Sequence, residues 1–236
     1  MTLFRNAALA FCLVPGMAAA DITSITDPAK TASFDILTAK VTRSGETLTF
    51  QMTTSGATGA EVPVASVALA GAAVQAYVWP TSLDPAAVGF EGGTGILALA
   101  ATSHPDFDDT PLYDEDADGD PANDGTLWHA HWVVLAPSTE CGPSNLAVRD
   151  IPDGQTPVMP ATWPGLPLFI DSPDVKPQMD GAAITVSVNV EGAEGASYDG
   201  VTSALRVNAD MHAPLLCVAD VFDIASGDLS LPGKID

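Results

Sequence analysis

Basic residues are scarce in this chain of 236 residues. Lys and Arg together number 8 against 30 Asp and Glu, which gives a formal net charge of −22 at pH 7. A surface this acidic repels nucleic acids and anionic lipid headgroups, and it concentrates cations around the protein. We therefore expect metal ions among the partners of this protein, and neither nucleic acid binding nor membrane insertion.

Long apolar runs, helical periodicity and known catalytic motifs are missing as well. Beyond the N-terminal segment, no run is long and apolar enough to span a bilayer. No Gly-x-Ser-x-Gly elbow, His-Glu-x-x-His pair or phosphate-binding loop is present. We therefore expect a binding protein and not an enzyme, with a metal-dependent oxidase or hydrolase as the alternative.

The N-terminal residues 1–20 predict a secretory signal peptide. Arg5 is followed by an apolar run and then by Ala18-x-Ala20. A charged start, an apolar stretch and a small-residue cleavage site in this order are typical of exported proteins. We expect residues 21–236 to form the mature protein, in the periplasm, secreted or at the cell surface.

Cysteine is rare, with 3 in the chain, of which Cys12 lies in the expected signal peptide. The remaining pair, Cys141 and Cys217, predicts a disulfide, since exported proteins meet an oxidising environment. Closing so long a loop would stabilise the fold by ~4 kcal/mol. A thiolate ligand to copper is the alternative role for these cysteines.

Several segments alternate apolar and polar residues between turn residues, as half-buried antiparallel strands do. These segments are 47–52, 73–79, 95–102, 183–191 and 204–212. The 20 glycines and 19 prolines fit a chain with many turns. We predict an all-β fold, a single antiparallel β-sandwich over residues 21–236, with a long acidic loop at 103–126 and a proline-rich stretch at 137–182.

Histidine is the residue type with the clearest functional pattern. The chain has 4, at positions 104, 129, 131 and 212. In LWHAHWVVL a strand period places His129 and His131 on one face, with Trp128 and Trp132 on the other. Imidazole suits zinc, copper, iron and nickel, so this pair predicts a transition-metal site. A solvated strand face is the alternative.

The third nitrogen ligand is expected from farther along the chain. His212 closes the segment 204–212 and could supply it, whereas His104 opens the acidic loop. Met211 offers a thioether, which favours cuprous copper. Because Met211 falls on the apolar face of its expected strand, we predict that it lies in the core instead.

The acidic loop itself predicts a calcium site. Its carboxylates and glycine follow the order in which a calcium-binding loop places its oxygen ligands, although Gly125 stands where a glutamate is usual. The candidate ligands are Asp114, Asp116, Asp118, Asp120 and Asp124. A solvated acidic loop is the alternative.

The segment TSHPDFDDTPLYDEDADGDPANDGTLWHAHWVVL, within residues 77–148, resembles the MopE/CorA type of secreted copper-binding protein from methane-oxidising bacteria. In that family a β-rich domain holds cuprous copper through histidines and a tryptophan oxidised to kynurenine. The resemblance implies copper, as Cu(I) or Cu(II), for scavenging, storage or delivery to a copper-transport partner. The implied ligands are His129, His131 and the distant His212, with Trp128 or Trp132 as the oxidised residue.

A second resemblance covers the opening of the expected mature chain. The segment FDILTAKVTRSGETLTFQM is similar to the first strands of DOMON-like ligand-binding sandwiches. It implies a haem- or sugar-binding module as an alternative, with His212 or Met52 as an axial haem ligand. A surface protein stabilised by calcium alone is a further alternative.

Overall fold

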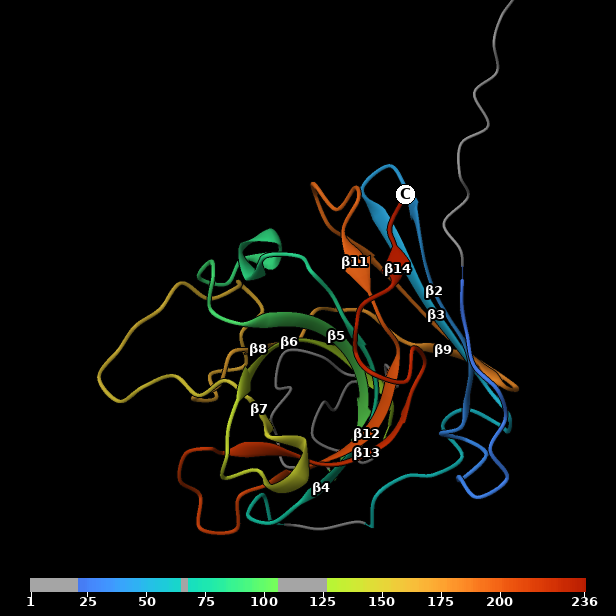
Figure 1. Cartoon of the computed structure of the whole chain (residues 1–236). Coiled ribbons are helices and arrows are strands. Elements are labelled where there is room, and N and C mark those ends of the chain that lie inside the picture. The colour runs from blue at the N-terminus through green and yellow to red at the C-terminus, as the bar shows by residue number, and fades with distance from the viewer. Residues whose placement is uncertain (1–20, 65–67, 106–126) are drawn as a thin grey trace, which may run out of the picture.

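The computed structural model describes residues 21–64, 68–105 and 127–236, which form an almost entirely β structure (Figure 1). The helices in these ranges are two short 3-10 turns, η1 (Pro85–Val88) and η2 (Gly142–Ser144). Within the described ranges, therefore, no helix has the length and apolarity to cross a membrane. The predicted all-β class is confirmed. The expected signal peptide and all the candidate calcium ligands lie outside the described residues.

One layer is a five-stranded antiparallel sheet in the order β1-β2-β3-β10-β9. Its strands are β1 (Ile22–Thr23), β2 (Ile36–Ser44), β3 (Thr47–Thr54), β9 (Gln178–Asp180) and β10 (Ala183–Asn189). The alternation in β3 and β10 sends every second side chain to the same face, so Phe50 and its cross-strand partner Val186 are both fully buried.

The other layer is a seven-stranded antiparallel sheet that closes on itself. Its order is β5-β4-β12-β13-β7-β6-β8, and β5 also pairs with β6. Its strands are β4 (Ala73–Pro80), β5 (Ile96–Ser103), β6 (His129–Pro137), β7 (Leu146–Val148), β8 (Ile170–Asp171), β12 (Val201–Val207) and β13 (Leu216–Ile224). Figure 1 looks into the resulting barrel, with β2, β3 and β9 to one side. A short ribbon of β11 (Ser197–Tyr198) and β14 (Gly233–Lys234) completes the strands.

Closure of the second sheet gives the molecule two separate apolar cores. The first lies between the five-stranded sheet and the outer face of the barrel, where Phe50 packs edge-on against Trp79 and Trp132. The second lies inside the barrel and includes side chains such as Val133 and Leu135. The predicted sandwich is therefore present as the contact between the two sheets, and its second layer is a barrel.

The predicted disulfide is confirmed. Cys141 and Cys217 are bonded across a sequence separation of 76 residues, with their Cα atoms 5.2 Å apart. The bridge ties the start of η2 to β13. These two sulfurs are therefore not thiolate ligands to copper.

The segment 204–212 differs from its predicted strand. Strand β12 ends at Val207, and the chain then turns, with Asn208 Oδ1 accepting a hydrogen bond from the Asp210 amide at 2.9 Å. Met211 has φ of 55° and is 46% exposed. The prediction that Met211 lies in the core was wrong, because an asparagine-capped turn interrupts the alternation before it.

Candidate metal centre

Three of the four histidines meet where β5 ends and β6 begins. These strands are antiparallel neighbours, with Thr102 opposite His129 and Ala100 opposite His131. His104 follows the last residue of β5 by one position, so the same pairing carries it to His129. Local strand geometry thus brings together residues that the sequence separates by an acidic loop.

The three imidazoles form a compact, buried group. His104, His129 and His131 each offer a ligand atom, and these atoms all lie within 4.8 Å of one another. The side chains are 5%, 8% and 2% exposed, respectively. Small side-chain rotations would bring three nitrogens so placed to one ion at the usual distance of about 2.0–2.1 Å.

Backbone carbonyls determine which nitrogen of each ring is available. The Nδ1 atoms of His104, His129 and His131 lie 3.0, 3.0 and 3.1 Å from the carbonyl oxygens of Pro105, Leu127 and Asp171. A carbonyl oxygen can only accept, so Nδ1 carries the proton in every ring. In each neutral ring Nε2 is then the lone-pair nitrogen. This is the arrangement that orients histidines for metal binding.

The Nε2 atoms need a cation between them. Those of His104 and His129 are 2.7 Å apart. With both Nδ1 atoms protonated, two lone pairs face each other at that distance, which is repulsive unless a proton or a metal ion lies between them. The Nε2 atom of His131 is buried and has no hydrogen-bond partner. A metal ion bound by all three Nε2 atoms satisfies the whole group.

The surroundings keep the rings of His129 and His131 neutral. The pKa of His131 is lowered to about 3, mainly by burial and to a smaller extent by the neighbouring His104. The pKa of His129 is also lowered well below its usual value, mainly by burial and to a smaller extent by His104 and His131. These two rings are therefore neutral at physiological pH and offer their lone pairs without first losing a proton.

The group contains nitrogen ligands only. Within the described ranges, no Asp, Glu or Cys belongs to it. The nearby Asp171 acts through its backbone carbonyl, which accepts from His131, while its own carboxyl accepts from Thr162 Oγ1 at 2.6 Å. Burial raises the pKa of the Asp171 carboxyl. Three imidazoles without a carboxylate suit zinc, copper, nickel or iron, and they do not suit calcium or magnesium.

The structure does not bring His212 to this group. His212 is exposed in the turn after β12, where its Nδ1 lies 2.9 Å from its neighbour Ala213's carbonyl oxygen. The predicted third nitrogen is replaced by that of His104. The signal was present in the sequence, since residues 95–102 and the His-x-His strand flank one loop and their pairing would place His104 beside His129.

Both tryptophans of the His-x-His strand pack away from the barrel interior. Trp132 is 3% exposed in the core between the sheets. Trp128 packs against Tyr77 of that same core, with ring centroids 5.1 Å apart, and its Nε1 is buried without a hydrogen-bond partner. The prediction that the indoles and imidazoles occupy opposite faces agrees with these positions. The haem alternative loses one of its axial ligands, because Met52 is fully buried between the sheets.

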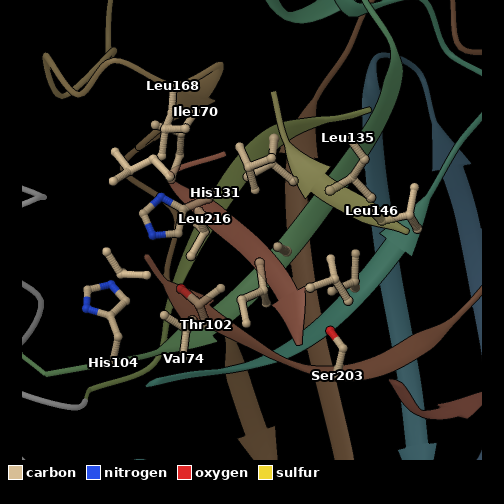
Figure 2. A pocket seen from close by; sticks show the side chains of 18 of the residues that line it. Val74, Thr102, His104, His131, Leu135, Leu146, Leu168, Ile170, Ser203 and Leu216 are labelled. Carbon is tan, nitrogen blue, oxygen red and sulfur yellow. The ribbon is translucent and has the colours of Figure 1, made fainter. Parts of the chain in front are cut away.

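The metal group lies at one end of a cavity in the barrel. His104 and His131 line this cavity together with Thr102 of β5. Figure 2 shows the two imidazoles close together beside Thr102, with Leu135 and Leu146 at the far end. The site therefore has an apolar chamber on its barrel side.

No protein-family model, curated protein or solved structure matches the chain. The feature of the described residues that bears on function is this buried group of three histidines, which could bind a metal ion.

Proposed function

We propose that this protein is an exported copper-binding protein that holds its ion through His104, His129 and His131. The observation that carries the proposal is that the Nδ1 atom of each of the three rings lies at hydrogen-bond distance from a backbone carbonyl oxygen. The Nε2 atoms are then the nitrogens that would bind the metal. The His131 Nε2, buried and without a partner, is the clearest sign that a ligand belongs there.

Copper is preferred over zinc for three reasons. Divalent copper binds a given set of nitrogen ligands more tightly than the other first-row ions do. The sequence around the site also resembles the MopE/CorA type of copper-binding protein. Cuprous copper tolerates low coordination numbers, which suits three neutral imidazoles in an apolar setting.

Export is supported by the covalent chemistry of the chain. The Cys141–Cys217 disulfide is typical of proteins that fold in oxidising compartments, where glutathione does not reduce it. The N-terminal sequence carries the features of a signal peptide. Scavenging, storage and delivery of copper are all consistent with such a location.

Competitive metal titration tests the proposal directly. The metal-free protein is titrated with Cu(I) under anaerobic conditions against a chromogenic chelator of known affinity, and separately with Zn(II). We expect one Cu(I) per chain with a Kd below micromolar. A copper Kd above micromolar would refute the proposal, and a lower Kd for zinc than for copper would replace copper with zinc.

Histidine variants then locate the ion. His104→Ala, His129→Ala and His131→Ala are each expected to weaken binding at least a hundred-fold, about 3 kcal/mol, because each removes one of three ligands. His212→Ala is the matched control, since it removes an imidazole that lies outside the group. Equal affinity in all four variants would place the ion elsewhere.

We also propose a separate calcium site in the acidic loop, on the strength of its carboxylate spacing alone. The site would use oxygen ligands from Asp114 to Asp124 and would be independent of the histidines. Calcium-dependent thermal stability that survives His131→Ala supports it. Indifference of the unfolding temperature to millimolar calcium would exclude it.

A further inference from the structure

The barrel interior holds a cavity of about 100 Å³ that metal binding does not explain. Its walls come from strands on every side of the barrel, and their apolar side chains include Ala100 and Val133. Val74 and Leu216, also in the lining, are labelled in Figure 2. Among the described residues that line it, four have polar side chains and none is an Asp, Glu, Lys or Arg; the four are Thr102, His104, His131 and Ser203. The cavity is thus an apolar chamber with a few polar groups.

Three of those polar groups gather at the end where β5 meets β6. Thr102 and His131 lie on neighbouring strands, and His104 follows directly after β5. His131 is 2% exposed, and its Nε2 has no hydrogen-bond partner. A buried acceptor of this kind costs free energy unless a ligand satisfies it, so it indicates where the polar end of an occupant would lie.

We propose that the barrel cavity binds a small uncharged alcohol, with the hydrocarbon body among the apolar walls and the hydroxyl group at His131. A hydroxyl donates a hydrogen bond to the Nε2 lone pair when no metal is bound. Its oxygen retains lone pairs, so it can become a ligand when a metal is bound. A carboxylate or an ammonium would lose its hydration on entering, and the described residues of the lining include no Asp, Glu, Lys or Arg to pair with it, so charged molecules of the same shape should bind more weakly.

The volume limits the size of the alcohol. An apolar cavity of about 150 Å³ accommodates the six carbons of benzene, so the barrel cavity, about two thirds as large, suits a body of about three to four carbons. Each methylene that enters an apolar cavity contributes about 0.8 kcal/mol, which corresponds to about a four-fold gain in affinity. Affinity should therefore rise along a series of linear alcohols and stop rising once the cavity is full.

The test uses the metal-free protein and four linear alcohols, ethanol, 1-propanol, 1-butanol and 1-pentanol, with binding measured by ligand-observed NMR and calorimetry. We expect the Kd to fall about four-fold per methylene until the chain no longer fits. Butanoate, the charged analogue of 1-butanol, is expected to bind at least ten-fold more weakly than 1-butanol. Equal affinity for butanoate, or no dependence on chain length, would overturn the proposal.

Two variants that fill the cavity locate the binding. Ala100→Leu and Val78→Phe add bulk at two lining positions that face each other across β5 and β4, and each should weaken 1-butanol binding at least ten-fold. Ala57→Leu adds the same bulk at an exposed position and should leave the Kd unchanged. Circular dichroism checks folding; if both variants unfold, the chain-length series in the unaltered protein still decides the question.

The metal-binding proposal and the alcohol-binding proposal can be refuted independently. The alcohol series in metal-free protein does not require any ion, and the copper titration does not require any alcohol. If copper binds and the alcohols do not, the cavity inference is wrong and the metal site stands. If the alcohols bind and copper does not, the reverse holds.

Discussion

Acidification should destabilise the metal-free protein through His131. In the unfolded chain this histidine titrates with an ordinary pKa near 6.5, whereas burial lowers its pKa to about 3 in the folded protein. Between these two values the unfolded state binds a proton that the folded state does not. Stability contributed by the neutral ring is therefore fully present above pH 6.5 and is lost as the pH falls toward 3.

The magnitude follows from the width of the window. Each pH unit below 6.5 costs about 1.4 kcal/mol for one such histidine, so the loss from pH 7 to pH 5 is about 2 kcal/mol. The pKa of His129 is lowered as well, again mainly by burial, so its contribution has the same sign. Carboxylates titrate mainly below pH 5, so the change in stability between pH 7 and pH 5 comes mainly from histidines.

Urea unfolding at a series of pH values, in the presence of a chelator, measures this loss. His131→Leu serves as the comparison, because leucine keeps an apolar side chain in the barrel and removes the titrating group. The loss of unfolding free energy between pH 7 and pH 5 should be smaller by about 2 kcal/mol in the variant. If the two proteins lose the same free energy over this range, His131 is not a buried neutral histidine.

Three further predictions concern the disulfide, the ligand set and the neighbouring tryptophan. Replacing Cys141 and Cys217 together by alanine should lower the free energy of unfolding by about 4–5 kcal/mol, as urea titration would measure, because the bridge spans 76 residues. Saturating copper should raise the unfolding temperature of His212→Ala as much as that of the unaltered protein, and should not raise that of His104→Ala; a shift in both would contradict the ligand set. Trp128→Phe should change the unfolding free energy by less than about 1 kcal/mol, since the buried Nε1 forfeits no hydrogen bond; a larger loss would indicate a partner for that nitrogen.

Periodicity alone predicted much of the sheet architecture. Alternation along residues 47–52 and 183–191 identifies β3 and β10, because one face of each is buried and the other is not. It also placed His129 and His131 on the face opposite Trp132. Closure of the second sheet could not be predicted in this way, since it depends on long-range pairing of β5 with β6 and not on any local pattern.

The third ligand shows where reasoning from the sequence was insufficient. His212 ends an alternating segment and so looked like a strand residue facing the site. Asn208 hydrogen-bonds into a turn before that point, which leaves His212 exposed. The proximity of His104 to His129 has no local sequence pattern, because it follows from the register between two strands that an acidic loop separates.

The contact between His104 and His129 has a consequence for the chain that joins them. These residues are 25 positions apart, and one ion bonded to both would act as a removable cross-link across the base of that segment. Unlike a disulfide, such a link breaks when the protein unfolds, so it stabilises the folded state by mass action, and its strength depends on the free metal concentration. At a concentration of one hundred times the Kd the stabilisation is about 2.7 kcal/mol, and it falls as the ion becomes scarce. The resistance of the protein to unfolding and proteolysis would then report the supply of metal around the cell.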